Sequence, residues 1–235
     1  MKKIIAAIFI FGVTNIASAI PSLQVHGVDS VAYDGFGDED TWLLTESSGR
    51  LELIGTYGPN TVNINNAYLV MTTAALDGNP FGSDYAKYDD SDAFEASLAG
   101  FDPKLKLNNH NPYGLDASLI DIFAYDLSLL DMGRFAAAGP TKDCNADVPG
   151  TTECAAASNS VGEIHTFNYD FTNLGLDWVH FDLVAFVTDE HGRRWTTTGE
   201  INPGSHDSTW RVSEPASLVL LSLGLFGLGF IRRKV

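Results

Sequence analysis

The sequence predicts an all-β protein, specifically an antiparallel β-sandwich of the jelly-roll or Ig-like kind. Several stretches alternate polar and apolar residues with the period of two that a half-buried strand requires. Clusters of Gly, Pro and Asn separate these stretches, as turns between strands do. A helical pattern is confined to residues 83–100, where an Asp-rich first half keeps any helix short. This combination is typical of a sandwich built as one domain.

The clearest alternation lies in residues 177–189. One face of this predicted strand is an apolar row of Val179, Phe181, Leu183, Ala185 and Val187. The other face is a mixed row of Trp178, His180, Asp182, Val184 and Phe186. Residues 162–171 place His165, Phe167, Tyr169 and Phe171 on one face, and residues 61–74 do the same for Val62, Ile64, Asn66, Tyr68 and Val70. Further strands are expected at 22–28, 41–46, 50–57, 117–127, 193–199 and 208–212.

Residues 139–160 are expected to form a long loop that holds the two cysteines, Cys144 and Cys154. Pro149 and Gly150 lie between them and favour a turn that brings the sulfurs together. In an oxidising compartment the expected outcome is one disulfide bond. A metal site is the alternative, but the sequence places no histidine near the two thiols.

The amino terminus predicts a cleaved secretory signal peptide over residues 1–19. Two lysines precede an apolar run, and Ala17 and Ala19 flank Ser18 in the small-x-small pattern that signal peptidase cleaves. The apolar run is too short to cross a bilayer core of about 30 Å. The mature chain is therefore expected to begin near Ile20.

The carboxyl terminus predicts a transmembrane helix over residues 216–231, followed by the basic end Arg232, Arg233 and Lys234. As a helix this uncharged run would measure roughly 24 Å, close to the thickness of a hydrocarbon core. The cations favour leaving the end in the cytoplasm. An exported amino terminus agrees with this topology, which leaves the body between the two ends outside the membrane.

The tail, from Val212-Ser213-Glu214-Pro215 through the Gly-rich apolar run to the basic end, resembles the PEP-CTERM sorting signal of Gram-negative bacteria that make exopolysaccharide. The resemblance implies recognition and removal of the tail by exosortase, a membrane peptidase. Ser213 stands where the family has its first proline. The chain thus divides into a signal peptide (1–19), an extracellular domain (20–211) and a sorting segment (212–235).

The body resembles a second family, the choice-of-anchor N proteins of bacterial surfaces, through ordered motifs within residues 108–212. They are NNHNPYGLDASLIDIFAYDL, GEIHTFNYDF, DWVHFDLVAF, GRRWTTT and NPGSHDSTW. This resemblance implies surface display and transfers no catalytic residue.

The charge balance limits the partners. Residues 20–213 carry 9 basic and 29 acidic side chains, for a net charge of −20. Such a field repels nucleic acid and anionic lipid. Two acidic clusters are candidate Ca²⁺ ligands, because hard cations prefer carboxylate oxygens. The clusters contain Asp34, Asp38 and Asp40 in one and Asp89, Asp90 and Asp92 in the other, and neither has EF-hand spacing. Otherwise no cofactor is expected.

The consecutive Ser205, His206 and Asp207 suggest a catalytic triad, but neighbouring side chains are expected to diverge. The histidines show no metal-binding spacing. Aromatic residues would stack on sugars only if exposed, and strand aromatics usually pack in the core. Arg193 and Arg194, beside Trp195, form the basic focus of the body, with pairing to Asp189, Glu190 or Glu200 or a ligand-binding role as the alternatives.

These observations favour an exported, non-enzymatic protein of the cell surface or extracellular matrix, transiently anchored in the inner membrane of a Gram-negative bacterium. It would act as a structural or glycan-interacting component of an exopolysaccharide or biofilm matrix. A secreted polysaccharide-active hydrolase is one alternative, and a calcium-stabilised adhesion module is another. Signal peptidase, exosortase and exopolysaccharide are the expected partners.

Overall fold

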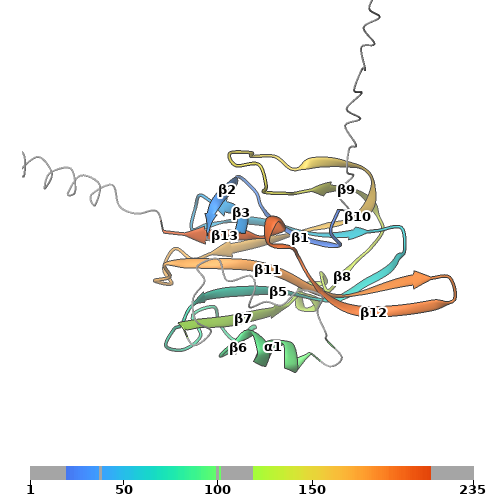
Figure 1. Ribbon diagram of the computed structural model, residues 1–235. Coiled ribbons are helices and arrows are strands. Elements are labelled where there is room, and N and C mark those ends of the chain that lie inside the picture. Colours follow the sequence, from blue (N-terminus) through green and yellow to red (C-terminus); the bar gives the residue numbers. More distant parts are fainter. Residues whose placement is uncertain (1–19, 37–38, 99–100, 102–118, 213–235) are drawn as a thin grey trace, which may run out of the picture.

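A computed structural model describes residues 20–36, 39–98, 101 and 119–212. The predicted signal peptide and the sorting tail beyond Val212 lie outside the described residues. Asp38 also lies outside them. Within these ranges, strands dominate and two sheets form the layers of a sandwich (Figure 1). No helix in the described part of the chain is long and apolar enough to cross a membrane.

The smaller sheet has the order β1-β4-β10-β9, and every pair in it is antiparallel. Its strands are β1 (Leu23–Gly27), β4 (Ser48–Tyr57), β9 (Gly139–Asp143) and β10 (Ala155–Asp170). The sequence predicted a loop over 139–160, and this is wrong at both ends, because β9 and the start of β10 pair there. A loop joins them between Asp143 and Ala155, and it carries the disulfide.

The larger sheet has the order β2-β3-β13-β11-β5-β7-β6, with β12 on β11 and β8 on β5. Its first members are β2 (Val31–Phe36), β3 (Glu39–Leu44), β5 (Thr61–Ala74), β6 (Tyr85–Tyr88), β7 (Ile120–Asp126) and β8 (Arg134–Phe135). The others are β11 (Trp178–His191), β12 (Arg194–Ile201) and β13 (Ser208–Arg211). Only β13 and β3 pair in parallel among the described strands. Strands β11 and β12 form a long hairpin whose outer end extends past its neighbours, at the right of Figure 1.

Three short helical segments complete the described fold. They are α1 (Ser91–Ser97), η3 (Leu127–Leu130) and η4 (Gly204–His206). Helix α1 lies beside β6 and β7, where Phe94 packs on Ile122 and Ala124 (Figure 1). The prediction of one short helix in residues 83–100 is confirmed, while the first half of that stretch forms β6 instead.

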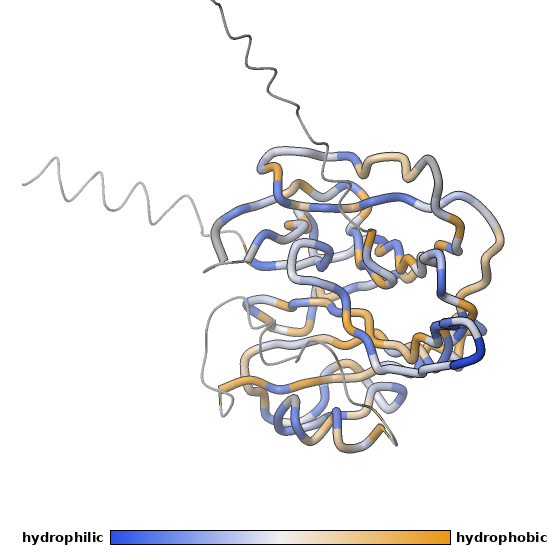
Figure 2. The backbone as a smooth tube through the Cα atoms, turned by 45° about the vertical axis from the view of Figure 1, so that its right-hand side comes forward, coloured by the Kyte–Doolittle hydropathy of each residue, from blue (hydrophilic) through white to orange (hydrophobic). Residues whose placement is uncertain are grey.

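The main core lies between the two sheets and confirms the predicted alternation. It contains the whole apolar row of β11, from Val179 to Val187, and Phe167, Tyr169 and Phe171 from the β10 side. Figure 2 shows hydrophilic and hydrophobic residues interspersed along the chain in both layers. Burial of these rows removes apolar surface from water, which is the main force that holds the two sheets together.

The predicted face of residues 61–74 is wrong because of a β-bulge. Asn66 adopts a positive φ of 49°, and the register with β11 shifts at this point. An extra residue in a strand reverses which side chains face the core. As a result Ile64 lies in the main core, whereas Tyr68 and Val70 pack on the opposite face of the sheet beside α1.

Candidate functional site

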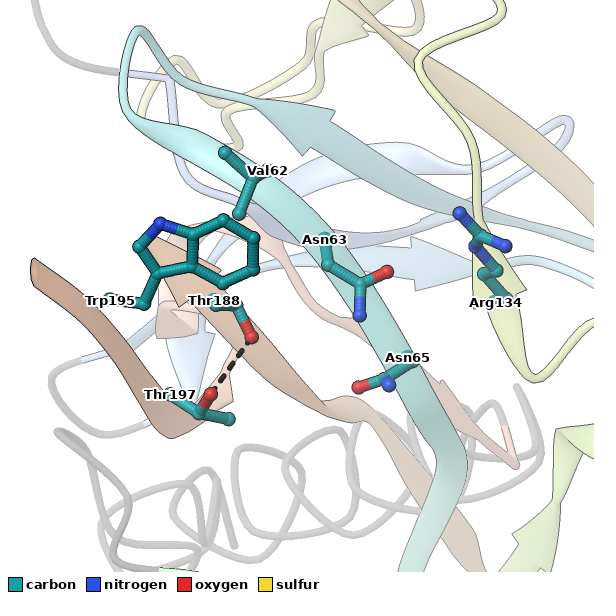
Figure 3. Close-up of a pocket in the computed structure, with 7 residues that line it drawn as sticks. All are labelled: Val62, Asn63, Asn65, Arg134, Thr188, Trp195 and Thr197. Carbon is teal, nitrogen blue, oxygen red and sulfur yellow. Dashed lines mark hydrogen bonds between the residues drawn. The ribbon is translucent and has the colours of Figure 1, made fainter. Parts of the chain in front are cut away.

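A shallow groove, mostly open to solvent, lies where β5, β8, β11 and β12 meet, and its volume is about 460 Å³. Figure 3 shows the side chains that line it, which are Val62, Asn63, Asn65, Arg134, Thr188, Trp195 and Thr197. We call it the Trp195 groove. Its volume falls in the range of roughly 300–1,000 Å³ that small-molecule sites occupy.

Strand register explains why these residues share one place. Thr188 on β11 pairs with Asn63 on β5 at one side and with Thr197 on β12 at the other. The hydroxyls of Thr188 and Thr197 lie 2.9 Å apart and form a hydrogen bond (Figure 3). Asn65 pairs with Arg134 of β8, which continues the polar floor. The groove is therefore a row of amides, hydroxyls and one guanidinium.

Trp195 is the exposed tryptophan of this protein. Its side chain is 68% exposed, whereas Trp42, Trp178 and Trp210 are each at most 6% exposed. In Figure 3 the indole lies beside Val62 and Thr188, above the polar floor. Burial of this exposed indole against a ligand would recover its apolar area.

Exposed cations lie near the groove, although the body as a whole is acidic. Arg134, Arg193 and Arg194 are all exposed. Asp189, one of the expected arginine partners, instead accepts a hydrogen bond of 2.9 Å from the hydroxyl of Thr61. The described residues that line the groove include no carboxylate. They can stack on and hydrogen-bond a polar ligand, but they do not provide the pair of acids that glycosidases use.

A second group of functional side chains is fully buried further along β11, on the face that points away from the main core. His180 Nε2 lies 3.5 Å from Asp182 Oδ2 and 3.5 Å from Asp207 Oδ2. His180 Nδ1 lies 2.8 Å from the hydroxyl of Thr209, and Asn202 donates to Asp182 at 3.3 Å. The ligand atoms of the histidine and the two aspartates lie within 4.8 Å of one another, a spacing that one metal ion could bridge. The sequence analysis placed His180 and Asp182 in one mixed row of this strand, but it did not connect Asp207 with them.

Of the consecutive Ser205, His206 and Asp207, the first two contact each other and the third lies elsewhere. Asp207 lies beside His180, as just described. The Ser205 hydroxyl does lie 3.0 Å from His206 Nδ1, so the prediction that these two side chains diverge is wrong. His206 Nε2 lies 3.0 Å from Asp143 at the end of β9. Burial lowers the pKa of His206, and the bond to Asp143 partly opposes that effect. These contacts tie η4 to β9.

The structure describes five of the six candidate calcium ligands, all except Asp38. Asp34 and Asp40 face each other across β2 and β3, and burial, with Asp34 and Asp147 nearby, raises the pKa of Asp40. Asp90 caps α1 by accepting a hydrogen bond of 2.7 Å from the Ala93 N–H. Asp89 and Asp92 are exposed, with Asp92 in the first turn of α1. Calcium binding by these groups stays a prediction.

The predicted disulfide between Cys144 and Cys154 is present. Cys144 is fully buried in a small apolar cluster with Trp42 and Ile54, and the Trp42 indole donates to the Cys144 carbonyl at 2.7 Å. Val212 is exposed and donates its N–H to Asp177 at the end of the described chain. The other predicted processing residues lie outside the described residues: Ala17, Ala19, Ser213, Glu214, Pro215, Arg232, Arg233 and Lys234.

Comparison with known proteins identifies one family feature. Residues 211–234 match the PEP-CTERM protein-sorting motif. This motif indicates an exported protein of a Gram-negative bacterium that is sorted at the membrane and processed by an exosortase-type protease. Comparisons with curated proteins and with solved structures give no match. The resemblance of the body to the choice-of-anchor N family remains a prediction.

Proposed function

We propose that the body of this exported protein binds polysaccharide through the Trp195 groove, as a non-enzymatic component of the cell surface or of an exopolysaccharide matrix. The observation that carries the proposal is the 68% exposure of Trp195 above a floor of amide and hydroxyl groups. An indole covers the C–H face of a sugar ring while polar neighbours bond to its hydroxyls. Sorting by the PEP-CTERM motif supports delivery to the space where such polymers lie.

The chemistry of the groove favours a neutral sugar over a cationic one, and Arg134 gives an acidic sugar a local partner on an otherwise acidic body. Arg134 is a permanent cation that would pair with a carboxylate or donate a hydrogen bond to a sugar hydroxyl oxygen, because its guanidinium carries five donors in a fixed fork. Asn63 and Asn65 offer both donors and acceptors. This arginine and the two exposed arginines of the nearby hairpin turn would repel a polycationic polymer.

Affinity electrophoresis tests the proposal. The protein released from cells would run through gels that contain the exopolysaccharide of the producing bacterium, and we expect its migration to be retarded. Trp195→Ala should weaken binding about tenfold, since loss of one aromatic stack costs on the order of 1.4 kcal/mol. Leu129→Ala is the matched control, because Leu129 is 61% exposed and lies on η3, outside the groove. Equal retardation of both variants would refute the assignment of the groove.

The same samples test the absence of enzymatic activity. We expect polymer incubated with the protein to keep its length and to release no new reducing ends. Progressive shortening of the polymer would instead support the hydrolase alternative.

A further inference from the structure

The disulfide lies at an edge of the sandwich where the two sheets are tied together. The loop between Cys144 and Cys154 makes backbone hydrogen bonds to the larger sheet and its connections. The Ala146 N–H donates to the Ser205 carbonyl at 2.8 Å, and the Ala32 N–H donates to the Thr151 carbonyl at 2.8 Å. The two sulfurs therefore sit at a junction of β9 and β10 with β2 and η4, and they do not merely close a surface loop.

His26, on the outer face of β1, lies against this disulfide. The ligand atoms of His26, Cys144 and Cys154 are within 4.8 Å of one another. The His26 side chain is nearly buried, at 6% exposure, and its ring meets Trp42 edge to face with centroids 4.6 Å apart. Its Nε2 is buried and has no hydrogen-bond partner within the described part of the chain. A buried ring nitrogen without a partner is costly unless it serves as a ligand or changes its bonding in another state.

The other ring nitrogen of His26 bonds to Glu52, which in turn pairs with Lys142. His26 Nδ1 lies 3.0 Å from Glu52 Oε2, and Lys142 Nζ donates to both carboxylate oxygens of Glu52 at 2.8 Å. The carboxylate fixes the proton on Nδ1, which leaves the lone pair of Nε2 available. This carboxylate–histidine arrangement is the outer support that metal-ligating histidines in proteins usually have.

We propose that the dithiol form of this protein binds one zinc-class metal ion through His26 Nε2 and the sulfurs of Cys144 and Cys154. Two thiolates and one imidazole suit a borderline, tetrahedral ion. Cys154 is only partly buried, so its side offers a position for a water ligand. Binding releases the two thiol protons: Zn²⁺ and two R–SH give Zn(SR)₂ and two H⁺.

A newly exported chain carries both cysteines as thiols, because cytosolic thiols are reduced. The metal would hold the β9–β10 loop against β1 until oxidation. A thiol oxidase of the exterior would then take two electrons from the thiolates, form the disulfide and release the ion. His26 is 118 residues from Cys144 in the sequence, so the missing nearby histidine that argued against a metal is supplied by the fold.

Cobalt(II) substitution tests the site. Protein released from cells would be reduced with a phosphine, freed of reductant without air and titrated with Co²⁺. We expect one equivalent to produce thiolate-to-cobalt charge-transfer bands and strong tetrahedral d–d bands, and Zn²⁺ to displace it. The oxidised protein should show neither set of bands. Glu52→Gln should weaken binding about tenfold or more, as loss of an outer support does.

His26→Gln should weaken Co²⁺ binding further and shift the d–d bands, since a nitrogen ligand is lost. His191→Gln is the matched control, because His191 is exposed in the β11–β12 turn. Melting curves of the oxidised variants report folding before reduction, and if His26→Gln fails to fold, the Glu52→Gln titration decides. Absent thiolate bands in the reduced protein, or bands and affinities in the His26 and Glu52 variants equal to those of the control, would overturn the proposal.

Discussion

Gly162 on β10 should not tolerate even a methyl group. A Cβ built there would lie 2.0 Å from the Gly55 carbonyl oxygen of β4 and 2.6 Å from Thr141 Cγ2. The oxygen belongs to the backbone, so β4 and β10 would have to separate. Overpacking with backbone movement costs about 1–3 kcal/mol. The lower entropy of the unfolded alanine chain offsets about 0.4–1 kcal/mol of this. Gly162→Ala should therefore destabilise the protein by about 1–2 kcal/mol.

Thermal unfolding followed by circular dichroism measures this effect. For a domain of this size, about 1–2 kcal/mol corresponds to a fall in melting temperature of about 2–8 °C. The control faces Gly162 directly, because Gly139 of β9 is its register partner. A Cβ at Gly139 would meet nothing within 4 Å, so Gly139→Ala should leave the melting temperature unchanged or slightly higher. Equal melting temperatures for the two variants would refute the β4–β10 packing described above.

Three further predictions concern stability. Replacing both Cys144 and Cys154 with serine should lower the free energy of unfolding by about 3 kcal/mol, because the disulfide closes a loop with a sequence separation of 10. A urea midpoint equal to that of the parent would contradict this. Burial first, then nearby negative groups, raises the pKa of both Tyr85 and Tyr169 to about 12. The folded state then holds protons that the unfolded chain loses near pH 10, so stability should be complete below about pH 10 and fall toward pH 12; tyrosinate absorbance that rises fully near pH 10 in the folded protein would argue against this. Trp195→Ala should change the free energy of unfolding by less than about 0.5 kcal/mol in chemical denaturation, because its side chain is exposed, and a larger loss would show that it packs in the fold.

Strand periodicity predicted much of the fold because burial of one face acts on every second residue. The apolar row of β11 illustrates this, since all of it enters the main core. The same method failed at Asn66, where a β-bulge adds one residue to β5 and so changes which side chains face the core. Asn66 adopts a positive φ at this bulge. Periodicity cannot detect a bulge. It also missed β8 and β9, which are too short or too polar to alternate visibly.

The candidate sites were harder to predict because their residues are distant in the sequence. The Arg-Arg-Trp focus pointed to Trp195, but only the pairing of β5, β8, β11 and β12 brings Asn63 and Arg134 to it. His26 reaches the disulfide because the chain after β9 returns to β1, where the Cys144 N–H donates a hydrogen bond to Gln24 Oε1. Asp207 joins His180 through the pairing of β13 with β11. Local sequence carries no signal for such long-range neighbours.

Intact-mass spectrometry of the protein released from cells tests the central claim most directly, namely that an oxidised body is exported and freed from its sorting tail. The account predicts a mass that lacks residues 1–19 and the apolar tail and is lower by two hydrogens for the bond between Cys144 and Cys154. A full-length mass with both thiols reduced, recovered from the cytosol, would contradict it.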